Sequence, residues 1–114
     1  MYKPTNQRIS DAARRYLELK DYADLEQFEW RDTPFIAAED LGELVIARVS
    51  CSTERVPEPW SDRDMFEQVA AFYLKGCEDA DVSVRGDSID MLVLEESRAL
   101  LRHTTNCSGG FRGA

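Results

Sequence analysis

The stretch Asp32–Ser50, DTPFIAAEDLGELVIARVS, decides the fold. It divides into two short apolar segments, Thr33–Glu39 and Glu43–Ser50, around a polar turn at residues 40–42. Both segments contain β-branched or aromatic residues, and Gly42 supplies the backbone freedom that a tight turn needs. The stretch therefore predicts a β-hairpin. Because it is the most apolar part of the first half of the chain, we expect the hairpin at the centre of a sheet.

A helix and a strand are expected before this hairpin. Residues 5–20 have an apolar face at a helical period, and Thr5 or Asn6 can cap the helix at its start. In residues 22–30, Phe28 and Trp30 alternate with polar neighbours, which indicates an amphipathic strand at a sheet edge.

A helix and two strands are expected after the hairpin. Pro57 and Pro59 predict a loop over residues 51–60, and Ser61 is expected to cap a helix that ends near residues 76–78. Residues 82–94 predict a strand with an irregularity at Gly86-Asp87, and residues 99–104 predict a last strand that pairs back. The order α-β-β-β-α-β-β defines an α+β fold, an α/β sandwich with helices packed on a mixed sheet.

Length and composition predict one domain in residues 1–107, followed by a flexible glycine-rich tail in residues 108–114. The chain has 114 residues, of which 43% are hydrophobic, so a single core is expected. Its three cysteines form no CxxC pair and its only histidine is His103, a composition that argues against zinc and favours reduced thiols. No apolar run resembles a signal peptide or a membrane span, so we expect a soluble, cytoplasmic protein.

The charge balance is acidic, with a formal net charge of −8. Non-specific binding of nucleic acid depends on many contacts from Lys and Arg to phosphates, so this balance disfavours nucleic acid as a partner. A solvated acidic surface is the expected consequence. The partner itself is unknown from sequence, with a protein partner or a second copy of the chain as the options.

Short motifs in both predicted helices, in the hairpin and near residue 85 carry a resemblance to a known family. The matching residues are Ala13, Tyr16 and Leu17, then Ile36, Ala38, Asp40, Leu44, Val45 and Val49, then Ala70–Leu74, and finally Arg85 and Asp87. Over residues 8–107 the chain resembles the small bacterial YraN family, whose hairpin reads G-E-I-D-L-I-A-x-D-G-x-x-L-V-F-V-E-V-K. That family has the restriction-endonuclease-like fold of the PD-(D/E)XK nucleases, so the resemblance implies this fold.

The departures from the family pattern lie at the positions that carry its chemistry. In the family, an Asp on the first hairpin strand and Glu-x-Lys on the second would hold Mg²⁺ and activate a water. The aligned residues here are Phe35, Arg48 and Ser50, and the acidic position of the first helix falls at Ser10. The resemblance therefore implies a catalytically inactive nuclease-like domain without a cofactor, which acts as a binding or interaction module.

Two alternatives stay open. The first is a nuclease whose Mg²⁺ site has been rebuilt from Glu39, Glu43 or Asp87, although Glu39 lies ~13 Å along the strand from the lost aspartate position. The second is a structural domain that forms a homo-oligomer through a sheet edge or through Trp30 and Trp60, which are more typical of core or loop positions.

Two polar residues in the apolar strands also need an explanation. An unpaired buried charge is expensive, so Arg48 is expected to pair with an acid such as Asp87 or Glu67, or to reach the surface. His103 and a cysteine could form a nucleophilic pair, but their spacing does not support one, and a structural histidine is expected.

Overall fold

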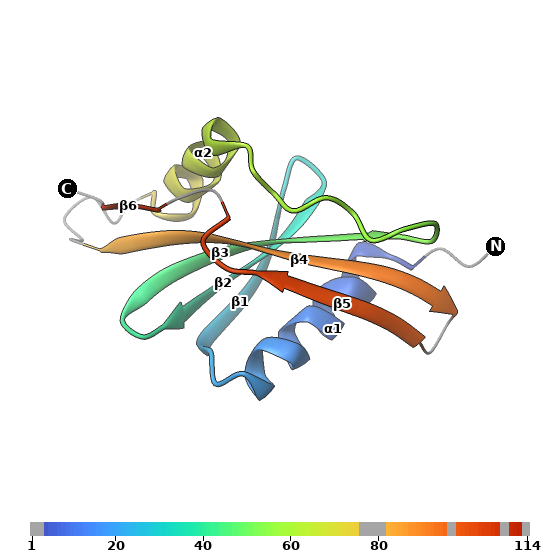
Figure 1. Ribbon diagram of the computed structural model, residues 1–114. Coiled ribbons are helices and arrows are strands. Elements are labelled where there is room, and N and C mark those ends of the chain that lie inside the picture. Colours follow the sequence, from blue (N-terminus) through green and yellow to red (C-terminus); the bar gives the residue numbers. More distant parts are fainter. Residues whose placement is uncertain (1–3, 76–81, 96–97, 108–109, 113–114) are drawn as a thin grey trace.

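Two helices pack on a mixed β-sheet in the computed structural model, which describes residues 4–75, 82–95, 98–107 and 110–112 (Figure 1). The order of the elements confirms the α+β class and the sequence α-β-β-β-α-β-β, with one short strand added at the end. In the described ranges, no helix has the length and apolarity needed to cross a membrane. The elements are α1 Asn6–Leu19, β1 Ala23–Trp30, β2 Thr33–Asp40, β3 Glu43–Ser52, α2 Arg63–Tyr73, β4 Ser83–Glu95, β5 Arg98–Thr104 and β6 Gly110–Arg112.

The predicted hairpin, β2 and β3, lies at the centre of the sheet. The strand order is β1-β2-β3-β4-β5, so β1 is an edge strand as expected. Neighbouring strands are antiparallel except for β3 and β4, which are parallel and are connected through α2. A parallel pair requires such a crossover, because its two strands begin at the same edge of the sheet.

The turn of this hairpin is as tight as the sequence predicts. Asp40 and Glu43 are paired, which leaves a loop of two residues, Leu41 and Gly42. Both have positive φ, 53° and 83°, the backbone geometry that matches the twist of the flanking strands. Gly42 adopts this conformation easily, whereas Leu41, which is 94% exposed, does so against its preference.

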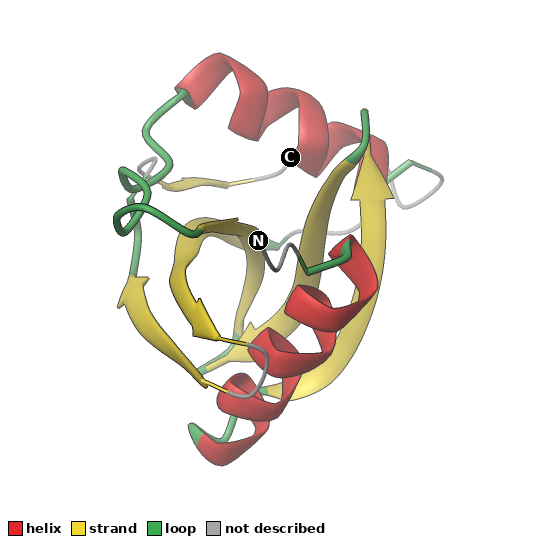
Figure 2. Cartoon of the chain, turned by 90° about the vertical axis from the view of Figure 1, so that its right-hand side faces the viewer, coloured by secondary structure: helices red, strands yellow, loops and turns green. Residues whose placement is uncertain are grey.

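The two helices cover opposite faces of the sheet, and Figure 2 shows the curved sheet between them. On one face, the buried side of α1 packs against apolar residues of the central strands, including Ile36, Val45 and Ile89. On the other face, α2 packs against a second set centred on Phe35 and Ile46. Because successive residues of a strand point to opposite faces, each central strand contributes to both cores.

The helix starts show one confirmed and one wrong prediction. Thr5 caps α1, and its side chain accepts a hydrogen bond from the backbone N–H of Arg8 at 3.2 Å. The cap of α2 is Asp62 rather than Ser61, because the Asp62 carboxylate accepts from the N–H of Met65 at 3.0 Å. Asp and Ser are comparable at this position, so sequence alone could not separate the two neighbours. Helix α2 ends at Tyr73, with Leu74 as its C-cap, and so stops before the predicted end at residues 76–78.

Strand β4 runs without the predicted irregularity at Gly86-Asp87. Both residues keep regular parallel pairing with β3, and the irregularity falls instead between Val93 and Glu95. The flexible tail predicted for residues 108–114 is wrong at residues 110–112, which form β6 and pair with the first residues of β4. Their glycine-rich context is more typical of a chain end. Cys51 and Cys107, the two cysteines that the structure describes, are not joined by a disulfide.

Candidate functional site

Four residues are aligned by the YraN resemblance with that family's metal site, and the hairpin places three of them on one face of the sheet. Phe35 and Arg48 are direct partners in the β2–β3 ladder, and Ser50 follows Arg48 on the same face by the period of two. This is the face that α2 covers. Ser10 is buried on α1, which packs on the opposite face, so it does not join the other three.

Aromatic side chains fill the space around the first of these positions. Phe35 has no exposed surface, and its ring stacks on Phe28 with 5.6 Å between ring centroids. Trp60 meets the ring of Phe35 edge-on at 5.5 Å and meets Phe66 in the same way at 5.7 Å. Phe35, which the resemblance aligns with a metal-binding Asp, is thus the centre of an aromatic core.

The side chain of Asp90, on β4, contacts the residues at the other two positions, Arg48 and Ser50. Its side chain is fully buried, and its Oδ1 accepts a hydrogen bond from the Ser50 hydroxyl at 2.7 Å. The Arg48 guanidinium lies 3.6 Å from the same oxygen, and that of Arg102 lies 3.4 Å from Oδ2. The Ser88 hydroxyl also lies within hydrogen-bonding distance of both carboxylate oxygens. We call these five residues the Asp90 cluster.

The expected acidic partner of Arg48 is therefore present, but it is neither of the two residues named from sequence. Asp87 is three positions from Asp90 on the same strand, so its side chain lies on the opposite face. Glu67 instead pairs with Arg63 at 3.1 Å on α2. Arg48 also donates to the carbonyl oxygen of Glu58 at 3.1 Å, and 22% of its side chain is exposed.

The chemistry of this face is that of hydrogen-bond donors rather than of a cation site. Arg48 brings a positive charge, and its Nε is a buried atom without a hydrogen-bond acceptor among the described residues. The same is true of Trp60 Nε1. Hard divalent cations need several oxygen ligands. Among the three aligned positions, only Ser50 has a side-chain oxygen, and its hydroxyl already donates to Asp90.

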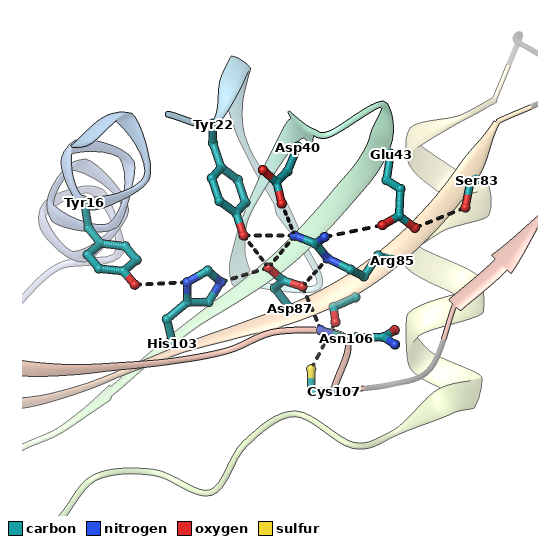
Figure 3. Close-up of polar contacts among 11 residues, drawn as sticks. Tyr16, Tyr22, Asp40, Glu43, Ser83, Arg85, Asp87, His103, Asn106 and Cys107 are labelled. Carbon is teal, nitrogen blue, oxygen red and sulfur yellow. Dashed lines mark hydrogen bonds and ion pairs between the residues drawn. The ribbon is translucent and has the colours of Figure 1, made fainter. Parts of the chain in front are cut away.

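A second polar network lies on the α1 face and is centred on Asp87 (Figure 3). Asp87 has no exposed surface, and its two carboxylate oxygens accept from four groups. Arg85 Nε and the Asn106 backbone N–H donate to Oδ1 at 2.9 and 3.0 Å. His103 Nε2 and the Tyr22 hydroxyl lie 2.8 and 3.2 Å from Oδ2. A buried carboxylate is tolerated here because it is both charge-paired and hydrogen-bonded.

Arg85 extends this network to the hairpin tip. Its Nη2 donates to Asp40 at 3.0 Å and to the Tyr22 hydroxyl at 2.9 Å, and its Nη1 lies 3.4 Å from Glu43. The guanidinium thus lies among three carboxylates, those of Asp40, Glu43 and Asp87, as Figure 3 shows. We call Tyr16, Tyr22, Asp40, Glu43, Arg85, Asp87, His103 and Asn106 the Asp87 network.

Glu43 and Asp87, two of the three residues proposed for a rebuilt metal site, therefore both pair with Arg85. The third, Glu39, is exposed and points to the other face of β2. Over the part of the chain that the structure describes, no group of three or more His, Cys, Asp or Glu is arranged to hold a metal ion.

Burial and hydrogen bonding act against each other on the charges of this network. Burial alone would raise the pKa of Asp87, but hydrogen bonds from His103, Arg85 and the Asn106 N–H outweigh it and hold that pKa below the ordinary value. Burial would likewise lower the pKa of Arg85, but its bonds to Asp87 and Asp40 raise it. Both groups are thus held in their charged forms.

Tyr16, His103 and Asp87 form a row that superficially resembles a catalytic relay. The Tyr16 hydroxyl lies 3.1 Å from His103 Nδ1, and His103 Nε2 contacts Asp87. Burial and the nearby charge of Asp87 raise the pKa of Tyr16, however, and they raise that of Tyr22 further. Both phenols are thus held in their neutral forms, and the row connects α1, β4 and β5. The structural role of His103 stays a prediction.

Asp90 and Tyr22 were not predicted from the sequence as site residues. A signal for Asp90 existed, since it is a lone acid between Ile89 and Met91 in an apolar strand, where a charge needs partners. Its partners could not be identified, because the parallel register that places Ser50 beside Asp90 depends on a crossover of the chain. Tyr22 has no comparable signal.

Comparison with known proteins finds no match among protein-family models, curated proteins or solved structures.

Proposed function

We propose that this chain is a restriction-endonuclease-like domain of the YraN type that no longer cleaves nucleic acid and acts as a binding or interaction module. The element order supports this proposal, because three antiparallel strands, a crossover helix and a parallel strand follow one another as the family resemblance implies. The hairpin also keeps the face on which such a site is mounted.

The proposed loss of catalysis rests on one observation, the pairing of Phe35 with Arg48 at the centre of the sheet. These residues occupy the positions of a metal-binding Asp and Glu in the family pattern. A phenyl ring has no ligand atom, and a guanidinium repels a cation. The carboxylate that binds Arg48 is that of Asp90, and its charge is shared by Arg48 and Arg102.

The alternative of a rebuilt metal site is not favoured by the contacts of the Asp87 network. Arg85 already pairs with Glu43 and Asp87, so a divalent ion would have to displace a largely buried guanidinium. The alternative of a homo-oligomer formed through Trp30 and Trp60 is not favoured at Trp60, because that residue is only 1% exposed. The guanidinium of Arg31 lies over the ring of Trp30, 4.3 Å from its centroid.

A nuclease assay tests the proposal. Purified protein is incubated with labelled single-stranded and double-stranded DNA and RNA in Mg²⁺ or Mn²⁺, with EDTA as the control. We expect no metal-dependent cleavage. Cleavage by the wild type that Glu43→Ala or Asp87→Asn abolishes would refute the proposal and support the rebuilt site. Cleavage that survives in both variants and disappears with Asp90→Asn would place activity in the Asp90 cluster and refute it equally.

A further inference from the structure

The segment that leads from β3 to α2 lies against the Asp90 cluster, and we call its residues 55–60 the strap. In Figure 1 the strap is part of the green loop between these two elements. Within the described part of the chain, no backbone–backbone hydrogen bond reaches residues 55–60. Pro57 and Pro59 have no backbone N–H to donate. The hydrogen bonds that hold the strap therefore come from side chains of the sheet.

Two arginines connect the strap to the buried carboxylate of Asp90, and both do so through Nη2. Arg48 Nη2 donates to the carbonyl oxygen of Glu58 at 3.1 Å and lies 3.6 Å from Asp90 Oδ1. Arg102 Nη2 donates to the carbonyl oxygen of Pro57 and lies 3.4 Å from Asp90 Oδ2. Each carboxylate oxygen thus positions one guanidinium, and the two guanidiniums hold two consecutive carbonyl groups of the strap.

The register of the sheet produces this arrangement. Ser50, Asp90 and Arg102 are direct partners in one row across β3, β4 and β5. Arg48 lies two residues before Ser50 and therefore points to the same face. Asp90, on the middle strand, thus has one arginine on each neighbouring strand.

The last residue of the strap is anchored in a different way. The Trp60 backbone N–H donates to the Ser88 hydroxyl at 3.0 Å. Its side chain is 1% exposed and packs against the rings of Phe35 and Phe66. Trp60 is therefore held by the core as well as by a hydrogen bond.

The rest of the strap lacks such an anchor. None of residues 55–59 is fully buried, and Arg55 and Glu58 are exposed. Segments with few buried contacts and no backbone ladder are the ones that open at a lower free energy than the whole domain. The contacts from Arg48 and Arg102 are therefore the ones that keep residues 55–59 on the sheet.

We propose that residues 55–59 open and close as a unit while Trp60 stays in the core, and that Asp90 sets this equilibrium through Arg48 and Arg102. Asp90 acts through the two guanidiniums, so it is a positioning residue. Opening removes the strap carbonyls from the Asp90 cluster and leaves the sheet folded. The strap thus controls whether a partner can reach Arg48. This inference does not depend on the proposed loss of catalysis.

Proteolysis of the native protein by trypsin tests the proposal. Trypsin cleaves after arginine, and cleavage of the Arg55–Val56 bond requires the strap to leave the sheet. Mass spectrometry measures the initial rate at which fragments 1–55 and 56–114 form. Circular dichroism in urea measures global unfolding of the same protein.

Two variants loosen the strap in different ways. Asp90→Asn removes the charge that positions both arginines. Arg102→Ala removes one of the two contacts to the strap, from a side chain that is 44% exposed. The matched control is Arg98→Ala on the same strand, where the side chain is 68% exposed and pairs with Glu95. Arg55→Gln removes the cleavage site and confirms the assignment of the fragments.

We expect the wild type to be cleaved at this bond at a rate that stays constant between 0 and about 1 M urea, because local opening exposes little surface. Arg102→Ala should raise this rate about tenfold, since it removes a hydrogen bond from a charged donor. Arg98→Ala should change the rate less than about twofold. Asp90→Asn should raise it at least as much as Arg102→Ala does.

Two results would overturn the proposal. One is a cleavage rate that rises with urea in parallel with global unfolding from the lowest concentration, which would show that the strap opens only when the domain unfolds. The other is an equal rate in Arg102→Ala and Arg98→Ala. Because Arg102 is partly exposed, Arg102→Ala decides the outcome even where Asp90→Asn does not fold.

Discussion

Phe35 and Arg48 face each other across the β2–β3 ladder, on the side of the sheet that α2 covers. One side chain is the centre of an aromatic core, and the other pairs with the buried carboxylate of Asp90. The two positions that the YraN resemblance aligns with metal-binding carboxylates therefore contribute packing and charge balance. Phe35 and Arg48 therefore stabilise the fold, whatever the domain binds.

The first prediction concerns the packing of Phe35. Phe35→Ala should lower the free energy of unfolding by about 3–5 kcal/mol, because it empties a fully buried site between Phe28 and Trp60. Urea unfolding followed by circular dichroism measures the change. Phe72→Ala is the matched control, since Phe72 is 52% exposed and its loss should cost about 1 kcal/mol or less. Equal effects of the two changes would contradict the assignment of Phe35 to the core.

The second prediction concerns the pH dependence of stability. The pKa of Asp87 is lower in the folded protein than its ordinary value of 3.8, so its contribution is complete above that pH and is lost as the pH falls through the lower, folded value. At pH 7, Asp87→Asn should be less stable than the wild type by about 3 kcal/mol. Below pH 3.8 this difference should shrink by about 1.4 kcal/mol per pH unit until the folded pKa is reached.

Urea unfolding of both proteins between pH 2 and pH 7 measures this difference. Asp64→Asn, a change on the exposed surface of α2, removes a carboxylate without touching the Asp87 network and serves as the control. A wild-type advantage over Asp87→Asn that stays constant down to pH 2 would show that Asp87 is not stabilised as an anion.

The third prediction concerns the turn of the central hairpin. Leu41 has φ of 53° and is 94% exposed, so its side chain gains little from packing while its backbone is strained. Asn tolerates this conformation much better than Leu does. Leu41→Asn should therefore raise the free energy of unfolding by about 1 kcal/mol, and Leu41→Val, with a branched Cβ, should lower it. If Asn and Val had the same effect in thermal unfolding, the left-handed turn would be in doubt.

Local patterns were sufficient to predict every described element except β6, and their order. The β-branched and aromatic residues of two apolar segments and the glycine of the turn identified β2 and β3, and the helical period identified α1 and α2. The partners of Asp90 and Asp87 could not be predicted, because both depend on the register of the parallel β3–β4 pair, which α2 and its loops determine over 30 residues of chain. The strand β6 was missed because pairing with β4, rather than composition, makes residues 110–112 a strand.

Titration calorimetry with Mg²⁺ and Mn²⁺ tests the central claim most directly. If aromatic packing and Arg48 have replaced the metal site, the wild type should show only weak, non-saturating heats that are unchanged in Asp90→Asn and in Glu43→Ala. The formal net charge of −8 accounts for such background binding. Saturable binding of one ion, abolished by either substitution in a protein that circular dichroism shows to be folded, would contradict the claim.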